Sequence, residues 1–145
     1  MGQHIELESA GVVLLAGQGE QLRAALLHRP HPEEWRLPKG KLKRGEAPEA
    51  AARRELAEEA GVAVDLGTPL SATDYTYRDT RGARVHKRVH FYLAVLPTPA
   101  ALRPEPGTFD RAEWFPPAEA LSLLSWPNER EMLREALALA AATPL

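Results

Sequence analysis

Three glutamates stand close together in the chain: Glu55, Glu58 and Glu59. The residues around them are good helix formers, with Pro48 tolerated in a first turn and Gly61 supplying a stop, so the pattern predicts a helix over residues 46–60. At about 100° per residue, the three carboxylates project from one face of this helix within a single turn. Like charges at this spacing repel, and Arg54 is the one obvious local cation. The cluster therefore favours binding of a further cation.

The residue types in this cluster indicate which cation it would bind. Carboxylate oxygens are hard ligands, and a set of them without histidine or cysteine selects Mg²⁺ or Mn²⁺ over zinc or copper. A glycine-punctuated loop, residues 35–46, precedes the helix and contains Lys39, Lys41 and Lys43. Loops of this kind receive phosphate. A solvated acidic face is the alternative for the glutamates alone, but the basic loop favours metal-binding acids beside a phosphate-bearing substrate.

Residues 40–62 complete the pattern G-x5-E-x7-R-E-U-x-E-E-x-G-U, in which U is aliphatic. The specified positions are Gly40, Glu46, Arg54, Glu55, Leu56, Glu58, Glu59, Gly61 and Val62. This pattern resembles the signature of the Nudix hydrolases at every specified position. The resemblance implies the Nudix fold for a single domain of residues 1–145, an α+β architecture in which a mixed β-sheet lies between helices as an α/β/α sandwich.

The resemblance also implies roles for individual residues. The glutamates Glu55, Glu58 and Glu59 would hold Mg²⁺ or Mn²⁺, with a backbone carbonyl of Lys39 or Gly40 as a further ligand. Glu46 would lie in a second tier around these ligands. Arg54 would pair with the helix carboxylates and orient them. The implied reaction is hydrolysis of a nucleoside diphosphate linked to another group, in which water attacks one phosphorus.

A carboxylate must take the proton of that water, and the resemblance leaves its identity open. Glu55 or Glu59 on the helix is the expected base. Many family members use an acid on a distal loop instead, where Glu105, Asp110 and Glu113 are all candidates. We favour Glu105 among these three because it lies in an irregular, proline-rich loop.

Residues outside the signature indicate the substrate. The lead-in Trp35-x-x-Pro38-Lys39-Gly40, and Tyr77 at 16 residues past Gly61, resemble Nudix enzymes that act on dinucleoside polyphosphates. We therefore expect hydrolysis of diadenosine tetra- to hexaphosphate. The alternatives are a pyrophosphatase for nucleoside triphosphates, including oxidised purines, and a diphosphoinositol polyphosphate phosphohydrolase. A Nudix module that senses a nucleotide without catalysis is a further alternative.

Basic and aromatic residues are the candidate contacts for such a substrate, because long polyphosphates carry several negative charges and an adenine can stack on an aromatic ring. The expected substrate-binding residues are Arg29, Lys39, Lys41, Lys43, Tyr77, Lys87 and His90. Tyr75, Tyr92 and Arg88 are neighbouring candidates on the same expected strands.

Hydrophobic and turn patterns predict the elements that position these residues. Strands are expected at residues 10–15, 22–29, 62–66, 72–78, 85–96 and 113–115. Besides the glutamate-bearing helix, helices are expected at residues 117–124 and 128–142, and residues 97–107 are expected to form an irregular loop.

The composition excludes several classes of partner. The 145 residues carry 18 lysines and arginines against 20 aspartates and glutamates, a formal charge of −2 that gives no global attraction for polymeric nucleic acid or an anionic membrane. Cysteine is absent, which suits a reducing cytosol and excludes disulfides and thiolate metal sites. With no apolar run long enough for a membrane span, we expect a cytoplasmic monomer or homodimer that binds a small nucleotide polyphosphate.

Overall fold

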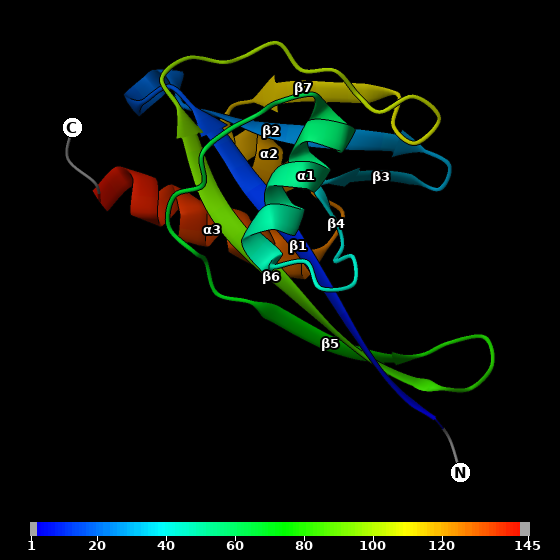
Figure 1. Cartoon of the computed structure of the whole chain (residues 1–145). Helices are drawn as coiled ribbons and strands as arrows, with labels where there is room; N and C mark the ends of the chain where they lie inside the picture. Colours follow the sequence, from blue (N-terminus) through cyan, green and yellow to red (C-terminus); the bar gives the residue numbers. More distant parts are fainter. Residues whose placement is uncertain (1–2, 143–145) are drawn as a thin grey trace.

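The computed structural model describes residues 3–142, which contain seven strands, three α-helices and one short 3-10 helix (Figure 1). Two thirteen-residue strands, β1 (His4–Ala16) and β6 (Arg84–Leu96), run parallel along their whole length and form the centre of the sheet. The other elements are η1 (Gly19–Gln21), β2 (Arg23–Pro30), β3 (Glu33–Arg36), β4 (Lys39–Lys41), α1 (Pro48–Ala60), β5 (Thr73–Arg78), β7 (Arg111–Phe115), α2 (Pro117–Leu123) and α3 (Pro127–Ala142).

The sheet is mixed. Its order is β3-β2-β1-β6-β5, while β4 pairs with β1 and β7 pairs with β2, and every pairing except that of β1 with β6 is antiparallel. β1 and β2 pair at Leu15↔Ala24 and Ala16↔Arg23, next to the connection that joins them. Further back along β1, residues 9–11 pair with β4 instead. β1 and β2 therefore diverge, and β4 lies where they separate.

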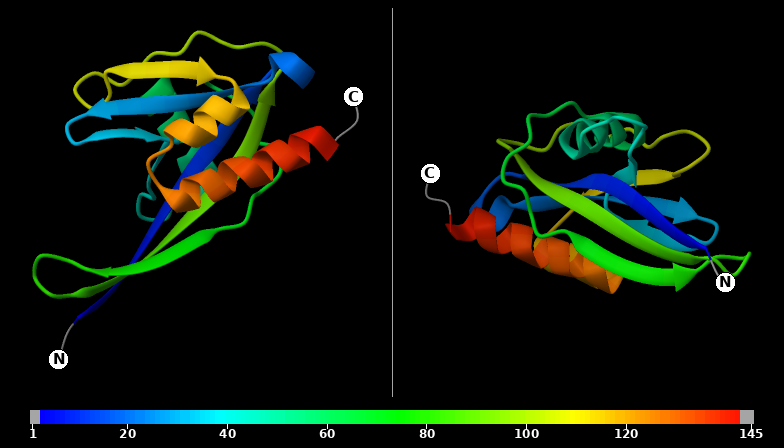
Figure 2. Two further views of the ribbon diagram at one scale, coloured as in Figure 1. Left: turned by 180° about the vertical axis from the view of Figure 1, so that it is seen from behind. Right: turned by 60° about the horizontal axis from the view of Figure 1, so that its bottom comes forward.

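Successive side chains of a strand point to opposite faces of the sheet, so the apolar residues of β1 contribute to two separate apolar layers. Val13 lies in a layer with Leu133 of α3, whereas Val12 lies in a layer with Leu56 of α1. Figure 2 shows α1 on one side of the sheet and α2 and α3 on the other. These layers confirm the expected α/β/α sandwich around a mixed sheet.

Most of the expected elements are present with ends shifted by one or two residues. This applies to β2, β5, β6, β7, α2 and α3, and residues 97–107 form the expected irregular loop. None of the helices within residues 3–142 combines the length and the apolarity that crossing a membrane would require.

The strand expected at residues 62–66 is a wrong prediction, since this segment is irregular. Val62 packs in the layer that contains α1. Just after the segment, the backbone N–H groups of Gly67 and Leu70 donate to carbonyls of β6, at 2.7 and 2.8 Å. The apolar residues that suggested a strand are thus accommodated against the helix without entering the sheet.

The stretch expected to be a basic loop contains β3 and β4, two strands of four and three residues. Strands this short and polar show no detectable alternation of apolar and polar residues. They form because β3 pairs with β2 and β4 pairs with β1. β1 likewise begins six residues before the expected start, because its alternating charged residues pair with β6. α1 begins at Pro48 rather than at residue 46, with Ala47 as its N-cap.

Candidate active site

The carboxylates of α1 are organised by Arg54, which lies on the same helix. Its guanidinium donates two hydrogen bonds of 2.8 Å to Glu46, one of 2.7 Å to Glu55 and one of 3.2 Å to Glu58. A further hydrogen bond, 3.1 Å long, reaches the carbonyl of Lys41 in β4. The hydrogen bonds from Arg54, followed by the N–H of Lys43, lower the pKa of Glu46 to about 2. Glu46 therefore stays ionised and holds the arginine in place.

Glu59 turns away from Arg54 and into the fold, where it is 7% exposed. Its Oε1 accepts a 2.8 Å hydrogen bond from the backbone N–H of Lys39. Burial raises the pKa of Glu59 to about 8, against the opposing effects of the Arg36 charge and of that hydrogen bond. Burial also raises the pKa of Glu55, although Arg54 opposes the shift. The site thus holds two desolvated carboxylates, Glu55 and Glu59, and the nearby positive charge does not offset the cost of burying their negative charges.

Gly40 allows the backbone of β4 to approach α1 closely. It pairs with Ala10 of β1, and a Cβ atom added at Gly40 would lie 2.1 Å from the carboxyl carbon of Glu55. A side chain and this carboxylate cannot occupy the same space, so a glycine is required for Glu55 to point at the backbone of β4.

The proline-rich loop brings Glu105 to the C-terminal end of α1. The backbone N–H groups of Arg103 and Glu105 donate to the carbonyls of Ala60 and Glu59, at 2.8 and 3.1 Å. The charge of Glu105 raises the pKa of both Glu55 and Glu59. The two other loop acids have partners elsewhere, since Asp110 binds His28 at 2.7 Å and Glu113 binds Arg111.

The donor set fits a divalent cation. Within residues 3–142, no three histidine or acidic side chains already converge as a metal cage, because Arg54 binds Glu55 and Glu58 while Glu59 binds the backbone. All the available donors are nevertheless hard oxygens, and the burial of Glu59 favours an added positive charge. Glu55, Glu58 and Glu59, with the carbonyl of Lys39 or Gly40, are the residues that could hold Mg²⁺ or Mn²⁺.

This electrostatic imbalance predicts that Mg²⁺ stabilises the fold in a pH-dependent way. The pKa of Glu59 is about 8 in the folded state against 4.5 for an ordinary glutamate, so the folded state binds the proton more tightly and stability falls as pH rises between these values. A bound cation replaces that proton. We expect a Mg²⁺ concentration of roughly 100 times the Kd at pH 8 to raise Tm by about 5–10 °C at pH 8, and the same concentration to raise it by less at pH 6, in thermal unfolding monitored by circular dichroism. An equal rise at both pH values would contradict this assignment of Glu59.

A cleft of about 480 Å³ includes in its lining Lys39, the residue whose backbone N–H binds Glu59. Its lining residues are Arg29, Glu34, Arg36, Lys39, Tyr75, Lys87, Trp126, Asn128 and Glu129. Three of the residues expected to bind substrate from the sequence lie in this lining: Arg29, Lys39 and Lys87. They come from β2, β4 and β6, so only folding brings them together.

The other expected substrate contacts lie outside this lining. Tyr77 stacks on Tyr75, with ring centroids 6.0 Å apart, and His90 forms a 3.0 Å contact with Glu8. The backbone N–H of Lys43 donates to Glu46 in the turn before α1. Lys41 lines a different hollow.

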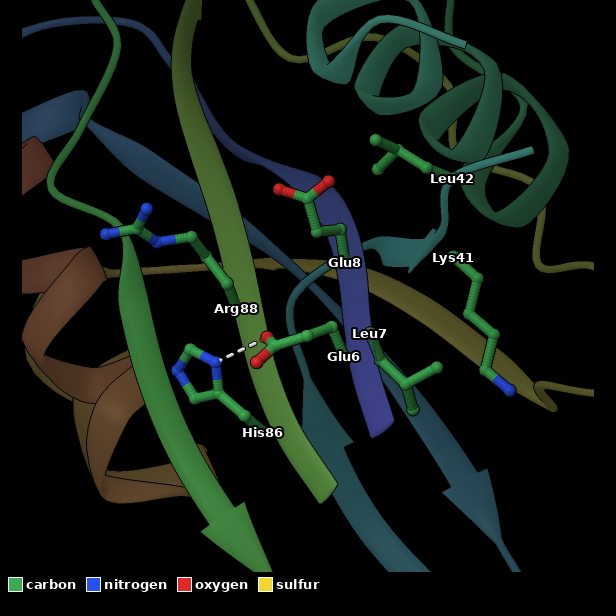
Figure 3. Close-up of a pocket in the computed structure, with 7 residues that line it drawn as sticks. All are labelled: Glu6, Leu7, Glu8, Lys41, Leu42, His86 and Arg88. Atoms are coloured by element: carbon green, nitrogen blue, oxygen red, sulfur yellow. Dashed lines mark hydrogen bonds and ion pairs between the residues drawn. The ribbon is translucent and has the colours of Figure 1, made fainter. Parts of the chain in front are cut away.

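That second hollow, of about 430 Å³, lies along the outer part of β1 and β6 (Figure 3). It is lined by Glu6, Leu7, Glu8, Lys41, Leu42, His86 and Arg88. Glu6 and His86 form a hydrogen bond of 2.6 Å across its floor. None of the glutamates of α1 lines either hollow. The first includes Lys39, whose N–H binds Glu59, and the second includes Lys41, whose carbonyl accepts from Arg54.

Charges in the cleft are only partly balanced. Glu34 lies 3.5 Å from both Arg29 and Arg36, and Glu129 lies 3.3 Å from Lys39. Lys87 has no carboxylate partner among the described residues, and its ammonium lies 6.0 Å from the ring of Tyr75. Burial, together with the charges of Arg36 and Lys41, lowers the pKa of Lys87. The lining thus carries four cations against two carboxylates.

Sequence reasoning missed several residues of this lining: Glu34, Arg36, Trp126, Asn128 and Glu129. The last three stand where α3 begins, a position that the sequence marks only by a proline and polar residues. Trp126, next to that proline, is the one residue type there that could have drawn attention to this helix start, and the structure leaves it 49% exposed.

Known proteins resemble this chain in sequence and in fold. The NUDIX domain family model matches residues 6–136. The 8-oxo-(d)GTP phosphatase of Mycolicibacterium smegmatis is 36% identical over 118 residues, which cover 81% of this chain but 34% of that protein, so the chain spans about a third of that relative's length. The RNA pyrophosphohydrolase of Erythrobacter litoralis is 28% identical over 141 residues, covering 88% of this chain and 85% of that protein.

Solved structures agree on the fold. An Ap4A hydrolase of C. elegans, solved as a binary complex, superposes with a TM-score of 0.77 at 24% identity and covers 94% of this chain and 99% of its own. At that identity the likeness concerns the fold alone. Because the family model matches residues 6–136, most of the chain, this protein belongs to the Nudix family.

Proposed function

We propose that this protein is a Mg²⁺- or Mn²⁺-dependent pyrophosphohydrolase that cleaves a phosphoanhydride bond of a nucleoside polyphosphate. The observation that carries the proposal is the double role of Lys39. Its backbone N–H binds the buried Glu59, while its side chain lines the cationic cleft. One residue of β4 therefore joins acids suited to a divalent ion to cations suited to phosphate.

The residues assigned to the metal are Glu55, Glu58 and Glu59, with a carbonyl of Lys39 or Gly40. When bound, the ion supplies positive charge to the phosphate oxygens and acidifies the attacking water. The chain itself orients the acids, because Arg54 holds Glu55 and Glu58 while the Lys39 N–H holds Glu59.

In the proposed reaction, the oxygen of a water molecule forms a bond to one phosphorus as the bridging P–O bond to the leaving phosphate breaks. Glu59 in its ionised form accepts the proton of that water, and the leaving phosphate takes up a proton from solvent. Glu59 is one of the two helix acids expected to act as base, and the N–H of Lys39 holds its carboxylate in place. Glu105 is the alternative base, since its loop docks on the end of α1.

For the substrate class, we infer a dinucleoside polyphosphate such as diadenosine tetra- to hexaphosphate. The excess of cations over carboxylates in the cleft supports a phosphate chain longer than a single pyrophosphate. Tyr75 and Trp126 also line the cleft, so each can offer an aromatic face to one of two nucleobases.

A nucleoside triphosphate, including one with an oxidised purine, is the second candidate substrate. Asn128 lines the cleft beside Trp126, and an amide can both donate and accept hydrogen bonds at a base edge. The relative from M. smegmatis is named for 8-oxo-(d)GTP, which supports the same class.

Product analysis by anion-exchange chromatography separates these candidates. The protein is incubated with Mg²⁺ and, in parallel, with diadenosine tetra- to hexaphosphate, dGTP, 8-oxo-dGTP, ADP-ribose and a diphosphoinositol polyphosphate. Release of ATP from the diadenosine compounds with little turnover of the rest is the expected result. Preference for 8-oxo-dGTP would select the second candidate, and no turnover of any compound would favour a nucleotide sensor.

Lys87 should contribute to substrate binding rather than to chemistry. Its ammonium lines the cleft from β6 and has no carboxylate partner within residues 3–142. We expect Lys87→Gln to raise KM by about tenfold with kcat nearly unchanged, the loss of about one charge-assisted contact. Steady-state kinetics on the preferred substrate checks this. Arg81→Gln, in the exposed turn between β5 and β6, is the matched control, and an effect confined to kcat would refute the binding role.

A further inference from the structure

Glu129, in the first turn of α3, is a buried charged residue that the proposed reaction does not use. It is 2% exposed. Its Oε1 accepts a 2.7 Å hydrogen bond from the backbone N–H of Leu37, and its Oε2 lies 3.3 Å from the ammonium of Lys39. Oε2 has no hydrogen bond of good geometry. A charge buried this deeply persists only where its contacts compensate for lost water, so the position of its partners is tightly constrained.

The partners of Glu129 belong to the segment that leads into β4. Leu37 and Lys39 are two residues apart, and the carbonyl of Pro38 between them accepts a 3.1 Å hydrogen bond from the N–H of Val12. On the far side of the segment, the N–H of Lys39 donates to Glu59. The segment 37–39 is thus held by α3, by β1 and by α1 at successive residues.

Glu129 is therefore connected to the acids assigned to the metal through segment 37–39, which binds Glu129 at one end and Glu59 at the other. If the Leu37 contact is lost, a buried N–H group is left without a partner, and the segment must shift to satisfy it. The Lys39 N–H would move with the segment, and Glu59 would lose its orientation. Groups that orient metal ligands in this way affect metal affinity by about 10- to 100-fold when they are removed.

We propose that Glu129 is a positioning residue for the metal-binding acids, which acts by holding segment 37–39 against α3 so that the N–H of Lys39 meets Glu59. The inference rests on the proposed function, because it takes Glu59 as a metal ligand. It assigns the effect to the reach of the side chain from α3 to the Leu37 N–H rather than to its charge.

Two substitutions distinguish reach from charge. Glu129→Gln keeps the length of the side chain and an oxygen acceptor but removes the charge, whereas Glu129→Asp keeps the charge and shortens the side chain by one methylene. If Glu129 acts by reach, the aspartate variant binds metal more weakly than the glutamine variant. If it acted as a negative charge near the cation, the order would be reversed.

The measurement is the Kd for Mn²⁺ of the substrate-free protein, followed by the electron paramagnetic resonance signal of free Mn²⁺. We expect Glu129→Asp to weaken binding by about tenfold and Glu129→Gln by no more than about threefold. Glu135→Asp is the matched control, because Glu135 also lies on α3 and accepts a 2.8 Å hydrogen bond from a backbone N–H, that of Ser71, outside the cleft. It should bind Mn²⁺ as the wild type does.

The outcomes separate the two proposals. Wild-type protein that fails to bind Mn²⁺ would overturn the proposed metal-dependent function and this inference with it. Wild-type binding with an unchanged Kd in folded Glu129→Asp, or with Glu129→Gln as the weaker binder, would overturn the inference alone.

Hydrogen exchange of the wild-type protein provides a test that needs no variant. Because coupling between two contacts is reciprocal, a cation that fixes Glu59 should also fix segment 37–39 on α3. We expect Mg²⁺ to slow exchange of both the Leu37 and the Lys39 amide, measured by NMR. Slowing at Lys39 without slowing at Leu37 would contradict the coupling to Glu129.

Discussion

Replacement of Glu59 by glutamine is expected to lower kcat by about 10²- to 10⁴-fold while leaving the fold intact. Glutamine has the same shape and keeps an oxygen that can accept the Lys39 N–H, so the local geometry is retained. The substitution removes the negative charge proposed to bind the cation and the basicity proposed to accept the proton of water. Steady-state kinetics with the preferred polyphosphate and saturating Mg²⁺ checks this expectation.

The same variant should also be more stable than the wild type without metal. The wild-type carboxyl loses its proton at a pKa of about 8 only against the penalty of burial, and glutamine avoids this penalty. We therefore expect a higher Tm for Glu59→Gln at pH 8 in the presence of a chelator. Glu49→Gln, at an exposed position of the same helix, is the control and should change neither kcat nor Tm. A Glu59→Gln variant with wild-type turnover would contradict the assignment of Glu59 as metal ligand and general base.

Gly40→Ala is expected to reduce kcat/KM by about 10- to 100-fold with little loss of stability. The added methyl group would lie 2.1 Å from the carboxyl carbon of Glu55, so one of the two groups must move. The carboxylate is the far end of a flexible side chain, whereas Gly40 is held in β4 by pairing with Ala10. Glu55 therefore moves out of its place beside β4, and the sheet stays as it is.

Gly67→Ala is a matched comparison with the opposite expectation. A Cβ atom at Gly67 would lie 3.0 Å from the backbone carbonyl oxygen of Leu93, which the sheet holds in place. This variant should lower Tm while the folded protein keeps its kcat/KM and its Mg²⁺ dependence. Thermal unfolding and kinetics on both variants test the pair. Equal losses of Tm with no selective loss of activity in Gly40→Ala would show that Gly40 serves only the packing of β4.

The helix that carries Glu55, Glu58 and Glu59 could be predicted from the sequence because it depends on local geometry. The positions of Glu55, Glu58 and Glu59 along one helix determine that they share a face, whatever surrounds the helix. The alternation within β5 and β6 and the apolar face of α3 are equally local, and these elements were predicted within one or two residues. The layered α/β/α arrangement follows from elements that must each bury an apolar face.

The cleft depends on contacts between distant parts of the chain, which local patterns do not encode. Lys39 and Lys41 stand two residues apart on β4, yet they line different hollows. The sequence marks both as basic residues before a helix and cannot separate them. Likewise, Trp126 and Glu129 join the site because α3 packs across the sheet beside β4.

Burial of individual side chains is likewise a property that local sequence patterns do not encode. Nothing near Glu59 in the sequence distinguishes it from Glu58, but the fold covers one and leaves the other open to solvent and to Arg54. The sequence by itself determined which residues are candidates for the chemistry and that they lie together on one helix, because helical periodicity is a local property. The tertiary structure alone decided which of them are desolvated, which cations face them and which backbone N–H orients them, because those properties depend on what packs around each residue.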